Sequence, residues 1–189
     1  MNDKNSAIVV VDMLYDFIDG TLACLNAEKA VEKSVEYIKK AFHTWGHPPI
    51  AFIKDSHPTD HCSFKERGGD WPIHCVEGTH GGDIHESLTP FVDEGMVFFK
   101  GRDRNEEQYS GAQGLNEAGQ SLCEVLNILD IKEVVICGIA TEFCVKNTAL
   151  DLLDAGFKVS LLKEGLGYVS EEGHKAAIEQ MKEKGIHII

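Results

Sequence analysis

The stretch Glu133-Val-Val-Ile-Cys-Gly-Ile-Ala-Thr-Glu-Phe-Cys144 is the part of the sequence around which the rest of this chain is organised. Its first part, Val134 to Cys137, is a short apolar and β-branched run of the kind that a parallel sheet buries on both faces. Gly138 then allows a sharp turn, and Thr141 is a candidate N-cap for a following helix. The stretch therefore predicts a strand, a turn and a helix whose first turn carries Cys144.

The position of Cys144 has two interpretations. In the first turn of a helix, unpaired backbone N–H groups and the helix dipole stabilise a thiolate and can hold an oxyanion, which suits a nucleophile. The alternative is a cysteine that packs as a small hydrophobic side chain, and free cysteine is among the most buried residue types. Position alone favours the second interpretation, so a nucleophile requires a base and a pocket from elsewhere in the chain.

Length and charge limit the class of protein. The chain has 189 residues, 43% of them hydrophobic, with a formal net charge of -13 and a sequence pI near 5.0. This length is enough for one domain over residues 1–189 to bury a core without disulfide or metal cross-links. The acidic balance argues against a nucleic-acid or anionic-membrane partner, because phosphate groups are bound chiefly through Lys and Arg.

The targeting and redox features predict a cytosolic (cytoplasmic) protein. No apolar run approaches the roughly 20 residues of a membrane span, and the N-terminus lacks the basic-then-apolar order of a signal peptide. The cysteines show no C-x-x-C spacing, and a domain of this size does not need bridges. We expect all six to be reduced: Cys24, Cys62, Cys75, Cys123, Cys137 and Cys144.

Apolar strands alternate with amphipathic helices along the chain. This order predicts an α/β fold in three layers, with a mostly parallel six-stranded sheet flanked by helices. The expected strands cover residues 7–11, 50–53, 96–99, 134–137, 157–162 and 186–189. The expected helices cover residues 27–44, 115–129, 144–156 and 170–185.

Charged residues stand at the ends of two expected strands. Asp12 follows the first strand and Lys100 follows the third. Taken singly, Asp12 is equally well explained as a turn former, and Lys100 as a surface lysine whose charged end reaches solvent. Because the carboxyl ends of parallel strands meet at one edge of a sheet, we expect Asp12, Lys100 and Cys144 to converge in one crevice. If they converge, Asp12 can act as a base, Lys100 as a stabilising cation and Cys144 as a nucleophile.

A polar segment after the second strand combines ligand-type side chains with low regularity. Asp55-Ser-His57 places two ligand-type groups on the same side of an extended segment. Further carboxylates and imidazoles follow at Asp60, His61, Glu66 and His74. One interpretation is a solvated polar loop, but this mixed oxygen and nitrogen donor set suits zinc, iron or manganese and favours a metal site.

These motifs resemble the nicotinamidase branch of the isochorismatase-like cysteine hydrolases, over nearly the whole chain. Val11-Asp-Met-Leu-Tyr-Asp-Phe17 is similar to the first-strand motif of that family. Phe99-Lys100 is similar to its lysine strand, and Gly138-Ile-Ala-Thr-Glu-Phe-Cys144 to its nucleophile turn. The resemblance implies a Rossmann-like, isochorismatase-like fold and a catalytic triad of Asp12, Lys100 and Cys144.

The resemblance also implies an oxyanion turn, a metal site and a pocket. The turn would contain a cis peptide bond between Ile139 and Ala140, and the oxyanion would sit against the N–H groups of Ala140 and Cys144. Asp55-Ser-His57 and Trp71-Pro-Ile-His74 are similar to metal-binding segments of nicotinamidases. The implied ligands are Asp55, His57, His74 and a fourth residue, Glu66 or alternatively His61. The residues expected to line the substrate pocket are Phe17, Trp71 and Tyr109.

The activity that the resemblance implies is hydrolysis of nicotinamide to nicotinate and ammonia through a Cys144 thioester, in NAD salvage. It implies one divalent transition metal, zinc before iron or manganese, and assembly into a homo-oligomer. Two other functions remain open. One is a related amidase or ureido-group hydrolase with the same triad and another small amide as substrate. The other is a non-catalytic metal- or ligand-binding module that kept the fold.

Overall fold

The computed structural model describes residues 5–189, and six strands in this part of the chain form one sheet in the order β3-β2-β1-β4-β5-β6. Every neighbouring pair is parallel. The strands are β1 Ser6–Val11, β2 Ile50–Asp55, β3 Val97–Lys100, β4 Glu133–Gly138, β5 Lys158–Leu166 and β6 His187–Ile188. The α-helices are α1 Tyr15–Ile18, α2 Ala27–Trp45, α3 Leu122–Ile128, α4 Lys146–Asp154 and α5 Glu171–Glu183. No helix within residues 5–189 has the length and hydropathy that a membrane span requires.

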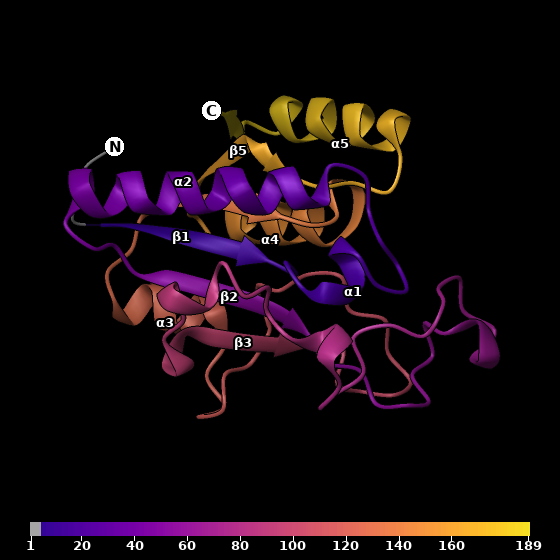
Figure 1. Ribbon diagram of the computed structural model, residues 1–189. Helices are drawn as coiled ribbons and strands as arrows, with labels where there is room; N and C mark the ends of the chain where they lie inside the picture. Colours follow the sequence, from indigo (N-terminus) through magenta and orange to yellow (C-terminus); the bar gives the residue numbers. More distant parts are fainter. Residues whose placement is uncertain (1–4) are drawn as a thin grey trace.

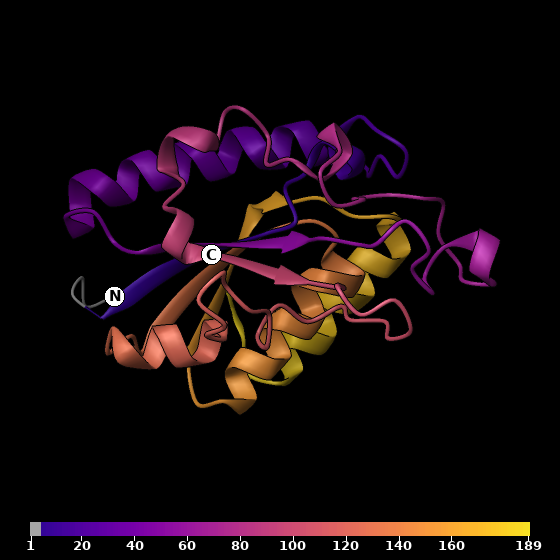
Figure 2. The same ribbon diagram turned by 90° about the horizontal axis from the view of Figure 1, so that it is seen from below.

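Helices cover both faces of the sheet (Figure 1 and Figure 2). Helix α2 lies on one face, and α3, α4 and α5 lie on the other. Strand β1 is apolar from Ala7 to Val11 because both of its faces are buried: Ala7, Val9 and Val11 face the core under α3, α4 and α5, while Ile8 and Val10 face the core under α2. A strand that is covered on both sides has no polar face. The predicted three-layer parallel architecture is confirmed.

The strand order reverses between β1 and β4. From this point the chain builds outward through β2 and β3 on one side and through β5 and β6 on the other. The connections that leave the carboxyl ends of β1 and β4 therefore diverge, and such a switch point is where α/β sheets bind ligands. The opposite directions of travel, with right-handed crossovers, also place α2 and α4 on opposite faces.

A long connection, residues 56–96, follows β2 and extends past the carboxyl ends of the strands (Figure 1). It contains four short 3-10 turns: η1 Lys65–Arg67, η2 His80–Gly82, η3 Thr89–Phe91 and η4 Glu94–Met96. The connection is held to itself by backbone bonds, including the N–H of His57 to the carbonyl of Cys75 at 3.0 Å and the N–H of Trp71 to the carbonyl of Ser63 at 3.0 Å. These bonds give defined positions to side chains that the sequence alone places only in a polar loop.

The helix expected from residue 115 begins later than predicted. Helix α3 starts at Leu122, because Ser121 and Glu124 form a reciprocal capping box: the Ser121 N–H donates to the Glu124 carboxylate at 2.7 Å, and the Glu124 N–H donates to Ser121 Oγ at 3.3 Å. Leu115 instead pairs with Phe99, whose N–H donates to its carbonyl at 2.9 Å. The sequence does contain the Ser-x-x-Glu signal for the observed start.

The helix after β4 also begins differently from the prediction. Residues Thr141–Val145 form a π-helical turn, η5, which leads into α4. Thr141 is not its cap: Ala140 holds that position, and the Thr141 hydroxyl donates to the carbonyl of Gly167 at 2.9 Å. Cys144 therefore lies in a widened turn, and π-helical turns are frequent at functional sites.

Gly138, the last residue of β4, tests the close packing at the switch point. Its φ is 144°, and an added Cβ would overlap the carbonyl oxygen of Val11. We predict that Gly138→Ala lowers the free energy of unfolding by about 3 kcal/mol, because backbone strain and overpacking add. The matched control is Gly156→Ala after α4, where φ is 95° but no atom lies near the added Cβ, so we expect a loss of about 1 kcal/mol. Urea unfolding of both variants measures the difference, and equal losses would contradict this account.

Candidate active site

Lys100 is the centre of a buried cluster of charged and nucleophilic groups. The residue is 1% exposed, and its Nζ lies 2.9 Å from Asp12 Oδ2. The same Nζ makes an ion pair with Asp55 Oδ1 and donates to Cys144 Sγ at 3.4 Å. The ends of β1, β2 and β3 and the turn η5 each contribute one of these groups. The structure thus brings together the predicted residues Asp12, Lys100 and Cys144.

Asp55 has a contact that the sequence analysis missed. It ends β2, which lies between β1 and β3 in the sheet, so Asp55 stands between Asp12 and Lys100. The backbone N–H of Asp55 donates to Asp12 Oδ1 at 2.9 Å, while its Oδ2 lies 3.6 Å from Nε2 of His57. One carboxylate therefore connects the lysine and cysteine cluster to the histidines. The strand order, which the sequence does not give, is the missing signal.

Burial and charge separate the pKa values of these groups. Burial raises the pKa of Asp12 to about 6, since the opposing charge of Lys100 does not fully compensate and Asp55 adds to the rise. Asp55 is desolvated too, but Lys100 and then His57 hold its pKa well below its usual range. Burial raises the pKa of the Cys144 thiol well above its ordinary value, although Lys100 opposes the rise. Asp12 is therefore the more basic carboxylate, and the thiol at rest keeps its proton.

The side chains of Asp55, His57 and His74 form a group that fits a metal ion. Each offers a ligand atom within 4.8 Å of the other two, and all three residues are buried. Nδ1 of His57 donates to the carbonyl of Gly101 at 2.9 Å, and Nδ1 of His74 donates to the carbonyl of Pro72 at 2.7 Å. These bonds leave Nε2 of each imidazole to ligate, which is the usual arrangement in protein metal sites. One carboxylate and two imidazoles suit zinc and similar divalent ions.

The structure does not bring Glu66 to this group. Glu66 lies in η1, where the chain is exposed, and is outside the group formed by Asp55, His57 and His74. The physical reason is local: spacing along an irregular segment does not fix the direction of a side chain. The alternative, His61, stacks on His57 with ring centroids 4.1 Å apart. Its ring nitrogens bond elsewhere, Nδ1 with Ser63 Oγ at 2.7 Å and Nε2 with the carbonyl of Glu106 at 3.0 Å.

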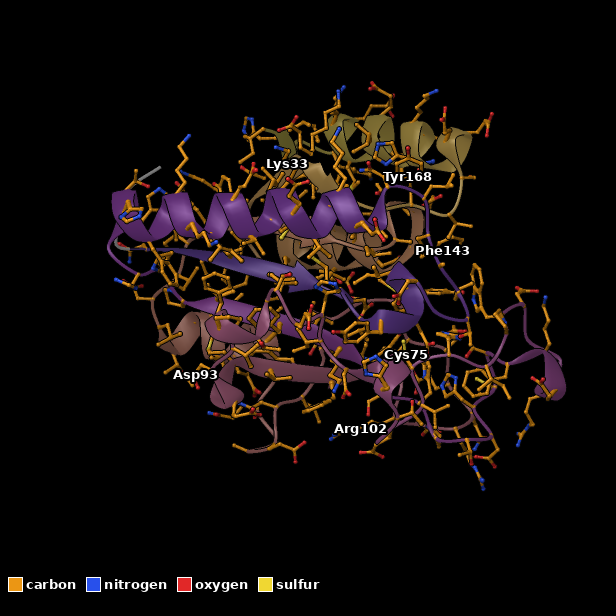
Figure 3. The ribbon with its side chains drawn as sticks, in the orientation of Figure 1. Lys33, Cys75, Asp93, Arg102, Phe143 and Tyr168 are labelled. Atoms are coloured by element: carbon orange, nitrogen blue, oxygen red, sulfur yellow. The ribbon has the colours of Figure 1, made fainter. Side chains whose placement is uncertain are left out.

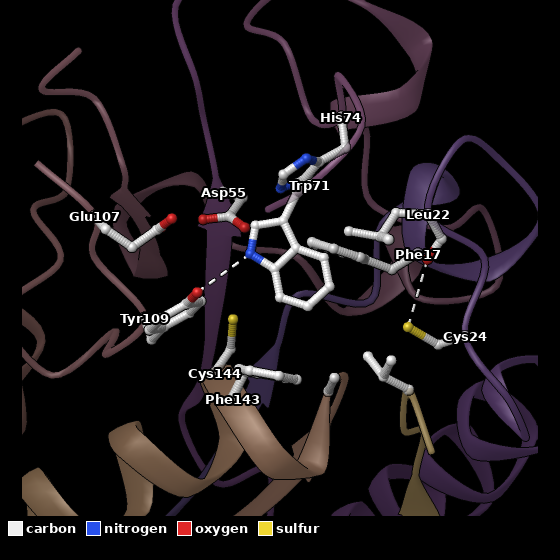
Figure 4. Close-up of a pocket in the computed structure, with 12 residues that line it drawn as sticks. Phe17, Leu22, Cys24, Asp55, Trp71, His74, Glu107, Tyr109, Phe143 and Cys144 are labelled. Atoms are coloured by element: carbon white, nitrogen blue, oxygen red, sulfur yellow. Dashed lines mark hydrogen bonds between the residues drawn. The ribbon is translucent and has the colours of Figure 1, made fainter. Parts of the chain in front are cut away.

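A pocket with aromatic walls opens beside Cys144 and His74 (Figure 4). It contains about 390 Å³ of empty space, including its mouth. The indole Nε1 of Trp71 donates to the hydroxyl of Tyr109 at 3.1 Å, and the ring of Phe143 meets Trp71 edge-on with centroids 5.1 Å apart. All three predicted lining residues, Phe17, Trp71 and Tyr109, are in its walls. The sequence analysis missed other lining residues: Leu22, Cys24, Glu107, Phe143 and Val169.

The turn between β4 and η5 contains the expected cis peptide bond. The peptide bond between Ile139 and Ala140 is cis. Ala140 lines the pocket next to Cys144. Ile139, Ala140 and Cys144 thus lie close together along the chain beside the pocket.

Asp16 is a further buried residue that supports the site. Its Oδ2 accepts the N–H of Cys75 at 2.7 Å, and its Oδ1 accepts the N–H of Thr21 at 3.2 Å. Cys75 directly follows His74 and has a positive φ of 46°; Figure 3 labels it among the loops past the strand ends. The neighbouring Phe17 packs on the His74 ring with centroids 5.5 Å apart. Asp16 lies within the motif Val11–Phe17, in which the sequence analysis assigned roles only to Asp12 and Phe17. A second carboxylate in that motif was the available signal.

An aspartate, a lysine and a cysteine brought together at the switch point of a parallel α/β sheet define an isochorismatase-like protein. The comparison with known families agrees: the model described as the isochorismatase domain matches residues 6–189, and the chain belongs to this family.

Within this family, the chain is similar to proteins named nicotinamidase or pyrazinamidase. The chain is 32% identical to the nicotinamidase/pyrazinamidase of Mycobacterium tuberculosis, with 97% of each protein covered. Among solved structures, a pyrazinamidase of Pyrococcus horikoshii in complex with zinc is 38% identical, with a TM-score of 0.83 and 98% of each chain covered. PnC1 of L. infantum in complex with nicotinate is 28% identical, with a TM-score of 0.85 over 99% of this chain and 93% of that one. The resemblance to the nicotinamidase branch is confirmed.

Asp16→Asn tests whether this residue positions the metal group. We predict that the variant binds zinc about tenfold more weakly, because an amide has one acceptor oxygen and cannot serve the N–H groups of both Thr21 and Cys75. Asp19→Asn, the same change at an exposed residue nearby, is the control and should bind as the parent does. Competition with a chromogenic chelator measures the affinity. Equal affinities in the two variants would show that Asp16 does not position His74.

Proposed function

We propose that this chain is a metal-containing nicotinamidase that hydrolyses nicotinamide to nicotinate and ammonia and serves NAD salvage, with residues 1–189 acting as a single domain. The observation that carries the proposal is the contact of the Lys100 ammonium with both Asp12 and Cys144 beside an aromatic pocket. The names of the relatives support the substrate class, since they refer to nicotinamide, pyrazinamide and nicotinate.

The first step is attack by the Cys144 sulfur on the carboxamide carbon. The thiol proton moves to Asp12, whose buried Oδ2 lies 2.9 Å from the Lys100 ammonium and whose pKa of about 6 makes it a stronger base than an ordinary aspartate. Lys100 stabilises the negative charge that develops on sulfur. Thiolate formation is thus coupled to substrate attack, since the resting thiol has a raised pKa.

The carbon–sulfur bond converts the amide into a tetrahedral oxyanion. The backbone N–H groups of Ala140 and Cys144 would hold this oxygen, and removal of one such donor costs about 3 kcal/mol in other acyl-transfer enzymes. Asp12 returns its proton to the nitrogen, the carbon–nitrogen bond breaks and ammonia leaves. Water then adds to the thioester with Asp12 again as base, and the thiol leaves with the proton while the acid is released.

The pocket orients the ring for this attack. Phe17, Trp71 and Phe143 provide apolar walls against which an aromatic ring can pack. Asp55, His57 and His74 would hold a divalent metal, which when bound supplies a Lewis acid for the ring nitrogen of the substrate. Zinc is the first candidate, because the donors suit it and the pyrazinamidase of Pyrococcus horikoshii was solved with zinc.

Cys144→Ala should abolish ammonia release from nicotinamide, with a loss in kcat on the order of 10⁴-fold or more, because no other group can form the acyl intermediate. Metal content and the unfolding midpoint should stay close to those of the parent. Cys123→Ala in α3 is the control and should remain fully active. A coupled ammonia assay measures turnover, and retained activity in Cys144→Ala would end the nucleophile assignment. Running the same assay with aliphatic amides and ureido acids separates nicotinamide from other substrates of the superfamily.

His57→Ala should lose the metal, because it removes a buried ligand whose tautomer is fixed by Gly101. We expect substoichiometric zinc after dialysis and a raised KM for nicotinamide. Glu66→Ala is the informative companion: its exposed position predicts that it keeps the metal. Metal analysis by mass spectrometry decides both. Loss of zinc from Glu66→Ala would restore Glu66 as the fourth ligand, and full zinc in His57→Ala would contradict the whole ligand group.

A further inference from the structure

Glu107 is an acidic residue at the pocket with no assigned role. Of the described residues that line the pocket, two are acidic, Asp55 and Glu107, and none is Lys or Arg. Asp55 is paired with Lys100, which it shares with Asp12. Glu107 takes part in no ion pair within residues 5–189. Glu107 therefore adds to the pocket lining a negative charge that no ion pair within residues 5–189 compensates.

The backbone on either side of Glu107 is held in place. The carbonyl of Glu106 accepts from Nε2 of His61 at 3.0 Å, and the side chain of Gln108 accepts the N–H of Gly101 at 3.1 Å. The next residue, Tyr109, accepts a hydrogen bond from the indole Nε1 of Trp71 at its hydroxyl. These anchors present the Glu107 side chain to the pocket, where its carboxylate points toward Asp55 (Figure 4).

The charge of Glu107 interacts with the catalytic groups. Partial burial raises the pKa of Glu107, the carboxylate of Asp55 adds to the rise, and His57 and Lys100 oppose it. The negative charge of the Glu107 carboxylate also repels an anionic ligand that enters the pocket. A neutral ligand of similar shape is not repelled, because it has no net charge for the field to act on.

Amide hydrolysis changes the charge of the ligand in this pocket. The carboxamide enters neutral, and the product leaves as a carboxylate. We propose that Glu107 is a specificity-determining residue that disfavours aromatic carboxylates relative to neutral carboxamides, so that it lowers product inhibition and excludes related acids. The inference rests on the proposed function, because it requires an aromatic amide as substrate.

The test compares inhibition by nicotinate in Glu107→Gln and in the parent holoenzyme. Removing one partly screened charge should lower the inhibition constant of nicotinate about three- to fivefold, while the KM for nicotinamide changes less than about twofold. The difference between variant and parent should shrink in 0.5 M salt, at a Debye length of about 4 Å. Glu106→Gln, the same change at the preceding residue, which is exposed like Glu107 but does not line the pocket, should behave as the parent.

A neutral ligand and the metal content separate charge from other effects. Binding of 3-pyridinemethanol, which has no carboxylate, should be the same in parent and Glu107→Gln. Equal tightening of both ligands would overturn the proposal, since it would reveal a change in pocket shape. Loss of zinc from Glu107→Gln would also overturn it, by making Glu107 part of the metal site.

Failure of the inference is distinct from failure of the proposed function. A parent enzyme that turns over nicotinamide, paired with a Glu107→Gln variant whose nicotinate inhibition is unchanged, would refute the role of Glu107 alone. A parent that carries zinc but releases no ammonia from any aromatic carboxamide would refute the proposed function, and the role of Glu107 with it.

Discussion

The site depends on the burial of one ammonium group among two carboxylates and a thiol. Taking Lys100 out of water costs several kcal/mol unless opposite charges surround it, and Asp12 and Asp55 both contact it. Two carboxylates then share one cation, so they cannot both be stabilised fully. Asp55, which also faces His57, keeps a depressed pKa, while the pKa of Asp12 rises to about 6. This division gives the proposed base and the proposed metal ligand their different properties.

The pocket is assembled from segments that have little regular structure of their own. Phe17 comes from α1, Trp71 from the connection between β2 and β3, Tyr109 from the loop after β3, and Phe143 from η5. Bonds between these segments, such as the one between Trp71 and Tyr109, replace the order that a helix or strand would give. The sheet fixes the reacting groups, and the connections fix the shape and charge of the cavity above them. Changes in the connections can therefore alter the substrate without disturbing the cluster around Lys100.

The sequence predicted the features that depend on hydrophobic periodicity and on which residues stand at the ends of strands. Buried strands read as continuous apolar runs, and Asp12 and Lys100 stood where parallel strands end. Sequence could not give the position of β2 between β1 and β3, so the contact of Asp55 with Lys100 was missed. The directions of Glu66 and His61 were equally inaccessible, because an irregular segment has no period. The wrong helix start at Leu115 had another cause: apolar spacing was followed there in place of the capping signal at Ser121.

The four groups of the cluster are spaced almost evenly along the chain. Asp12 and Asp55 are 43 residues apart, Asp55 and Lys100 are 45 apart, and Lys100 and Cys144 are 44 apart. Contacts between such distant residues form only after long loops have closed, which is the slow part of folding. Until β1 to β4 have all docked, the ammonium of Lys100 lacks its partners and is more stable in water than in the core. Recovery of activity during refolding therefore reports the docking of β1 to β4 around Lys100.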